Sequence, residues 1–174
     1  GMAAQMIALL NVCEAGDQIV AAKTLYGGTH TQLSVNFKKL GIETVFIDSS
    51  DPENFARAIT PKTKAIVPVH LFGLAAEMKE INLLAKQHGL WVVEDAACGF
   101  GSHYHGQHVG TLGDAGCFSF HPRKAITTGE GGMVVTDDPA LAERCRSLRN
   151  LCFQPARRFV HEEMGWNFRL TNIQ

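Results

Sequence analysis

The chain has 174 residues, of which 45% are hydrophobic and 19% charged, and its 16 basic and 17 acidic residues leave a formal net charge of −1. This size and composition are typical of one globular domain with a substantial core. The balanced charge argues against nucleic acid as a partner. The sequence has no apolar run long enough to span a membrane. Five scattered cysteines favour a reducing compartment, so we predict a cytoplasmic protein.

The first half of the chain alternates between helical and extended hydrophobic patterns. We expect Thr29 to cap one of its helices, and Asp51 to cap another that has Pro52 in its first turn. The expected helices cover residues 3–13, 29–40, 51–59 and 76–88, and the expected strands cover 18–22, 43–47, 64–69 and 90–94.

The second half begins with a loop expected over residues 99–114, followed by strands at 115–120 and 133–136 and a helix at 139–151. The last strand follows a glycine-rich link too short for a parallel crossover, so it is antiparallel or lies elsewhere in the sheet. The final residues, with Arg157, Arg158 and Arg169, are irregular or begin a new unit. The alternation predicts an α/β fold with a mainly parallel, mixed sheet flanked by helices on both faces.

Two charged side chains follow buried strands, where open α/β sheets bind their ligands. Lys124 lies just beyond the strand at 115–120, and burial there would make its amine available to a cofactor aldehyde as a Schiff base; a solvated loop lysine is the alternative. Asp95 directly follows the strand at 90–94, where its carboxylate requires a cation or a donor. A pyridinium nitrogen would meet that need, although Asp95 could instead cap the following turn.

Three further features could hold the other parts of a cofactor. The backbone amides of Met2 and Ala3, preceded by Gly1, begin the first helix and could bind a phosphate. Ser119 offers a hydroxyl near Lys124, or is a plain strand serine. Tyr26 follows a strand, so its ring could cover a cofactor ring or simply be a half-buried aromatic.

Three histidines, His103, His105 and His108, lie in one short polar loop. Nothing nearby in the sequence completes a set of metal ligands around them. We therefore predict no metal site.

The stretch FSFHPRKAITTGEGGMVVT resembles the cofactor-lysine motif of the DegT/DnrJ/EryC1/StrS sugar aminotransferases, which use pyridoxal phosphate. The resemblance begins near Val67 and includes PVHLFGLAAEM and EDAA. It implies the large domain of the fold type I pyridoxal-phosphate transferases, with Lys124 as the Schiff-base lysine, Asp95 on the pyridine nitrogen and Ser119 on the phosphate. A branch of the family with histidine at the lysine position performs dehydration, so Lys124 favours transamination. The family usually has Gln, His or Glu after EDAA, whereas this chain has Cys98.

The segment GWNFRLTNIQ, at residues 165–174, resembles a family segment whose asparagine reaches the cofactor phosphate of the neighbouring subunit. That asparagine would be Asn167, with Arg169 close to it. The resemblance implies a homodimer with a shared active site. The alternative is that both residues are ordinary polar surface residues.

The first third of the chain, up to about Ile66, is more similar to the pyridoxal enzymes of cysteine and methionine metabolism, such as the O-acetylhomoserine sulfhydrylases. The similar stretches are GMAA, AAKTLYGGTHTQL and ITPKTKAI. In those enzymes the Gly-Met amides hold the phosphate, and the tyrosine equivalent to Tyr26 stacks on the cofactor ring. Their lysine motif, Ser-x-Thr-Lys-Tyr, is absent here, so we give the second half of the chain more weight.

Together the motifs imply that residues 1–174 are an incomplete cofactor-binding large domain, without the family's N-terminal segment and small C-terminal domain. The implied reaction transfers an amino group, from glutamate in the family, to a keto-sugar nucleotide. Two alternatives remain open. One is an O-acetylhomoserine sulfhydrylase or lyase, and the other is a fragment that binds the cofactor without turnover.

Overall fold

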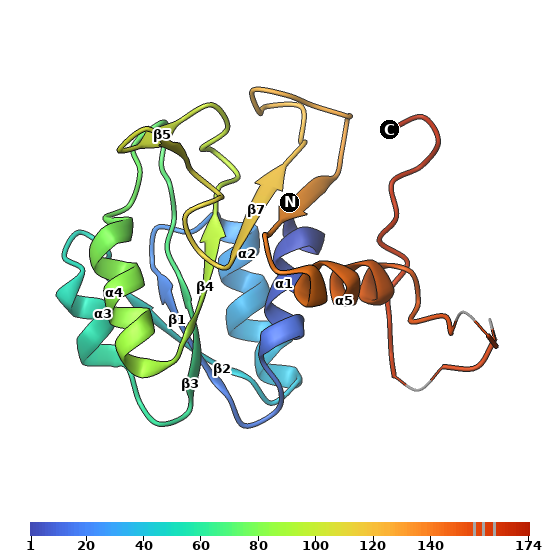
Figure 1. Ribbon diagram of the computed structural model, residues 1–174, viewed down its shortest axis with the longest axis horizontal. Coiled ribbons are helices and arrows are strands. Elements are labelled where there is room, and N and C mark those ends of the chain that lie inside the picture. Colours follow the sequence, from blue (N-terminus) through green and yellow to red (C-terminus); the bar gives the residue numbers. More distant parts are fainter. Residues whose placement is uncertain (155, 158, 162) are drawn as a thin grey trace.

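The computed structural model describes residues 1–154, 156–157, 159–161 and 163–174, so Arg158 lies outside the described residues (Figure 1). In this part of the chain the main sheet has the strand order β2-β1-β3-β4-β7-β8. Its first five strands are parallel, and β8 pairs with β7 in the antiparallel direction. The strands are β1 (Gln18–Ala22), β2 (Glu43–Ile47), β3 (Thr63–Val67), β4 (Trp91–Asp95), β7 (Ala115–Ser119) and β8 (Gly132–Val135). The predicted mixed α/β sheet is therefore confirmed.

Helices cover both faces of this sheet (Figure 1). On one face lie α1 (Met2–Val12), α2 (Gly27–Thr31), its π-helical continuation η1 (Gln32–Phe37) and α5 (Pro139–Arg149). On the other face lie α3 (Glu53–Ala58) and α4 (Met78–His88). The strand β1 has apolar side chains on both faces of the sheet, so both layers of helices are needed to bury them. Its Ile19 packs in the core with α1 and η1, whereas the next residue, Val20, packs with α3 and α4, because successive strand side chains point to opposite faces.

Three local predictions differ from the structure. Thr29 does not cap a helix, because α2 begins at Gly27 with Tyr26 as its N-cap, which leaves Thr29 buried inside the helix. The loop at 99–114 contains a short antiparallel hairpin, β5 (His103–Tyr104) with β6 (Gln107–His108), which the sequence pattern did not indicate. The expected cap of α3 is shifted by one residue, because Pro52 is its N-cap, and Asp51 precedes it with Oδ1 accepting from the backbone N–H of Glu53 at 2.9 Å.

A buried carboxylate holds the loop at 99–114 against the sheet. Glu94, in β4, is fully buried and accepts hydrogen bonds from the backbone N–H groups of Gly110 (2.7 Å), Leu112 (2.7 Å) and Gly113 (2.6 Å). It also lies 2.8 Å from Nε2 of His70. Because Nδ1 of His70 accepts from the N–H of Ala76, Nε2 carries the proton that Glu94 accepts.

We expect Glu94→Gln to destabilise the protein, because the amide nitrogen replaces one acceptor oxygen and meets groups that are themselves donors. Leaving buried donors unpaired should lower the free energy of unfolding by about 3 kcal/mol. Urea denaturation followed by circular dichroism measures this change. The matched control is Glu80→Gln on α4, where the side chain is exposed. A loss for Glu94→Gln no larger than that of the control would contradict this account of the loop.

Candidate active site

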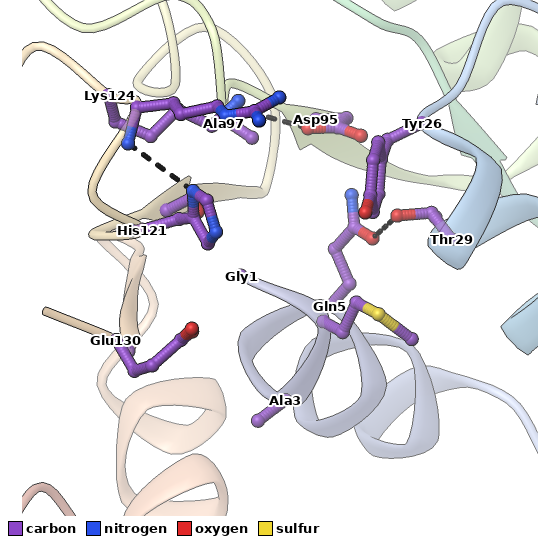
Figure 2. Close-up of a pocket in the computed structure, with 14 residues that line it drawn as sticks. Gly1, Ala3, Gln5, Tyr26, Thr29, Asp95, Ala97, His121, Lys124 and Glu130 are labelled. Atoms are coloured by element: carbon purple, nitrogen blue, oxygen red, sulfur yellow. Dashed lines mark hydrogen bonds between the residues drawn. The ribbon is translucent and has the colours of Figure 1, made fainter.

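The carboxyl ends of β4 and β7 meet at a cavity of about 560 Å³ (Figure 2). Every predicted site residue except Asn167 lines it. The cavity is lined by Gly1, Met2, Ala3, Gln5, Tyr26, Thr29, Asp95, Ala97, Ser119, His121, Arg123, Lys124, Glu130 and Gly131. The parallel pairing of β4 with β7 brings these ends together, because neighbouring parallel strands finish at the same edge of a sheet.

Asp95 is the last residue of β4 and only 5% exposed. Burial raises the pKa of its carboxyl above the ordinary range, and the hydrogen bond from the backbone N–H of Ala97 together with the Gln5 side chain offsets part of this increase. The Ala97 bond, 3.1 Å to Oδ1, is the turn cap that we considered as an alternative role. Asp95 therefore caps its turn and also presents a poorly solvated carboxyl to the cavity.

Lys124 lies in the turn that follows β7. Its backbone N–H donates to the carbonyl of His121 at 2.9 Å, and its Nζ donates to Sγ of Cys98 at 2.9 Å. Cys98 belongs to the turn after β4, so this contact brings the amine across to the strand end that carries Asp95. Figure 2 shows the Lys124 side chain extending toward Ala97. The amine and the carboxyl thus reach the same cavity from two different strands.

The start of α1 closes another side of the cavity. Gly1 is its N-cap, and within the described residues no side chain caps this end. A helix N-terminus of this kind presents unpaired N–H groups and a partial positive charge. Ser119 lines the same cavity from the end of β7. The predicted phosphate-binding amides and hydroxyl are therefore brought together.

The glycine-rich link before β8 allows the sheet to approach α1 closely. A Cβ on Gly132 would lie 2.6 Å from the carbonyl oxygen of Phe118 and would also overlap the backbone of Gly1. Only glycine fits at this position without displacing backbone atoms.

We expect Gly132→Ala to push the start of α1 away from β7 and to destabilise the protein by roughly 2 kcal/mol, as overpacking does. Thermal unfolding followed by circular dichroism measures the loss. Gly27→Ala is the matched control, since a Cβ on Gly27 would meet no atom within 4 Å. Equal melting temperatures for the two variants would show that the close approach is not required.

Several cavity residues were not predicted from the sequence. Gln5 and Thr29 are each only 3% exposed, and the Thr29 hydroxyl donates to Oε1 of Gln5 at 2.9 Å. His121, Arg123 and Glu130 reach the cavity from the loop around Lys124. The signal for Gln5 was present in the sequence, because a single glutamine interrupts an otherwise apolar helix at 2–10.

Asn167 lies outside this cavity. It forms an isolated bridge with Asn150 and, with Arg169, lines a separate hollow along β8 and α5. Nη1 of Arg169 donates to Oδ1 of Asn150 at 2.5 Å. Both residues are exposed. A role for Asn167 across a subunit boundary therefore stays a prediction.

The sequence analysis also predicted that the chain has no metal site and no membrane-spanning segment. Nε2 of His108 accepts from the N–H of Gly101 at 2.9 Å, and among the described residues no three His, Cys, Asp or Glu side chains form a group that could hold a metal. None of the helices in the described ranges combines the length and the apolar character needed to cross a bilayer.

Comparison with known proteins identifies the family. A model of the DegT/DnrJ/EryC1/StrS aminotransferase family matches residues 1–174. The chain belongs to this family. The match includes the first third of the chain, so the resemblance of that part to the enzymes of cysteine and methionine metabolism is not shown.

Two curated relatives share much of the sequence. GDP-perosamine synthase of Escherichia coli O157:H7 is 42% identical over 165 residues, which cover 91% of this chain and 44% of the relative. UDP-N-acetyl-3-dehydro-alpha-D-glucosamine 3-aminotransferase of Acidithiobacillus ferrooxidans is 45% identical over 142 residues, which cover 78% of this chain and 38% of the relative. The chain thus spans less than half the length of each.

The fold is shared with solved members of the family. The crystal structure of S. venezuelae DesV, determined in complex with a ketimine intermediate, superposes with a TM-score of 0.88 at 37% identity. The superposition covers 99% of this chain and 47% of DesV. The sheet and helices described above are therefore those of the fold type I aminotransferases.

Proposed function

We propose that this chain forms the pyridoxal-phosphate site of an aminotransferase that transfers an amino group, with glutamate as donor, to a keto-sugar nucleotide. The observation that carries the proposal is the meeting of Lys124, Asp95 and the uncapped start of α1 in one cavity. The names of the two curated relatives, a GDP-perosamine synthase and an aminotransferase of a dehydro UDP-sugar, support the choice of substrate class.

The residues of the cavity fit this cofactor. Asp95 is a buried carboxyl whose pKa is raised by desolvation, so a cationic ring nitrogen beside it would supply the missing charge partner. The amides of Met2 and Ala3 and the hydroxyl of Ser119 would hold the phosphate. Tyr26 is 73% exposed, so its ring is available to cover the cofactor ring. When bound, pyridoxal phosphate supplies an aldehyde for a lysine amine and a ring that accepts electron density from the substrate.

Each protein group then has a defined task. Nζ of Lys124 would hold the aldehyde of the cofactor and, as a free amine, would act as the general base and acid that moves the proton of the amino donor. The Asp95 carboxylate would accept a hydrogen bond from the protonated ring nitrogen and so favour its cationic form. Sγ of Cys98 receives the hydrogen bond of the Lys124 amine at 2.9 Å, which orients that amine toward the strand end where Asp95 lies.

We further propose that the site is completed in a homodimer, in which Asn167 reaches the phosphate of the neighbouring subunit and Arg169 lies close to it. The exposure of both residues, and their position outside the cavity of their own chain, support this arrangement. A cytoplasmic location fits the five free cysteines, four of which are buried.

We expect Lys124 to be the lysine that captures the cofactor. The chain is mixed with pyridoxal phosphate, reduced with borohydride and digested, and the labelled peptide is found by mass spectrometry. The label should lie on Lys124 and be absent from that peptide in Lys124→Ala. Lys23→Ala is the matched control, because Lys23 pairs with Asp48 at 2.5 Å and lies outside the cavity. A label distributed over surface lysines, unchanged in Lys124→Ala, would refute the assignment.

Activity assays then separate the remaining alternatives. The chain, and any longer form of the protein, is assayed with glutamate and keto-sugar nucleotides and, separately, with O-acetylhomoserine and sulfide. Conversion of O-acetylhomoserine alone would favour a sulfur amino-acid enzyme, which the motifs of the first third resemble. A label on Lys124 without turnover of either kind would identify a fragment that binds the cofactor without catalysis.

A further inference from the structure

We propose that Gln5 is a positioning residue for Asp95: Thr29 fixes the orientation of its side-chain amide, and the amide NH₂ donates to the Asp95 carboxylate and holds it ionised at the cavity. The sequence motifs assign no role to Gln5 or Thr29. The inference extends the proposed function, because Asp95 is the group that would face the cofactor ring.

The orientation of the amide follows from its partners. The Thr29 hydroxyl donates to Oε1 of Gln5 at 2.9 Å, so the oxygen end of the amide faces α2. The NH₂ group must then point the other way, toward the cavity that Asp95 also lines, and the Gln5 side chain lowers the pKa of Asp95. Figure 2 shows Gln5 standing on α1 between Thr29 and Asp95. The proposed chain of hydrogen bonds therefore begins at Thr29 on α2, passes through Gln5 on α1 and ends at Asp95 on β4.

Burying the Gln5 amide costs free energy unless both ends of the amide have hydrogen-bond partners. Gln5 is 3% exposed, and its neighbours on α1, Ala4 and Ala8, are buried apolar residues. A buried amide without partners would destabilise the fold, whereas an apolar side chain at the same place would need none. The amide oxygen has its donor in Thr29, and Asp95 is the acceptor that the proposal gives to the NH₂ group. The chemical effect of this amide is to favour the charged form of a carboxyl that burial alone would keep protonated.

Other groups act on Asp95 from the elements packed around it. The backbone N–H of Ala97, the amino group of Gly1 at the start of α1 and the amine of Lys124 all lower the pKa of Asp95, in addition to Gln5. The Cys117 thiol faces it from β7. All of these groups remain in a Gln5 variant, so a change of charge at Asp95 in that variant reports on the amide alone.

The test measures the titration of Asp95 directly, without cofactor. The chain is labelled with ¹³C, the carboxyl resonance of Asp95 is assigned by its loss in Asp95→Asn, and its pKa is followed by NMR. Gln5→Leu removes the donor at nearly constant volume and should raise the pKa by about one unit, a tenfold change in proton affinity. Gln5→Glu places a second carboxyl beside Asp95 and should raise it further.

Thr29→Val is the matched variant that leaves Gln5 in place. It removes the hydroxyl that fixes the amide, so we expect a smaller rise in the same direction. Circular dichroism selects the folded variants, and Thr29→Val carries the test if substitutions at Gln5 prevent folding. The order wild type, Thr29→Val, Gln5→Leu, Gln5→Glu supports the proposal. An Asp95 pKa that is unchanged in the folded variants overturns it, because a merely structural glutamine would alter the melting temperature and leave the titration alone.

The titration of Asp95 tests the role of Gln5 separately from the proposed function, because it is measured without cofactor. If the titration shifts as expected and borohydride labels no Lys124, Gln5 controls the charge of Asp95 in a site that holds some other cation. If Lys124 is labelled and the titration does not shift, the proposed function stands and the role of Gln5 falls.

Discussion

The buried Glu94 carboxylate is the constraint on which the site depends. A charge withdrawn from water must find donors inside the protein, and Glu94 finds the His70 ring and three backbone amides of the loop at 99–114. These bonds hold the loop against β7. The backbone of Gly110 lies so close to Gly116 that a Cβ on Gly116 would overlap the Gly110 backbone. Glu94 thus fixes the end of β4 from one face of the sheet. The next residue, Asp95, points to the other face, where the cavity lies.

The separation of these two carboxyls follows from strand geometry. Val92 packs with α3 and α4, and Val93 packs with α1 and η1. Because side chains alternate, Glu94 shares the face of Val92 and Asp95 shares the face of Val93. Two adjacent acidic residues in the sequence therefore have different roles. Glu94 organises the fold, and Asp95 faces α1 and the cavity.

Much of this could be predicted from the sequence, because hydrophobic periodicity and strand ends are local properties. The strands of the main sheet, the α/β alternation and the positions of Asp95 and Lys124 after buried strands were all visible, whereas the hairpin of β5 and β6 was not. The pairing of β4 with β7 was not, since strand order depends on contacts across the whole chain. The Thr29 to Gln5 hydrogen bond joins two helices in the same way. Thr29 resembles a cap in sequence, but α2 begins two residues earlier, which turns its hydroxyl inward.

The register of β4 against β7 links the anchoring of the loop at 99–114 to the alignment of the site residues. Asp95 pairs with Cys117, which packs in the core against α1. Ser119 lies two residues further along β7 and so shares the face of Cys117, which places its hydroxyl on the side of the sheet where α1 begins and where Asp95 points. A slip of one residue would turn Ser119 to the opposite face and separate it from the carboxyl. Glu94 pairs with Gly116 in this same register. Gly116 leaves room for the loop and the Glu94 carboxylate anchors it, so the hydrogen bonds of Glu94 that stabilise the fold also align the site.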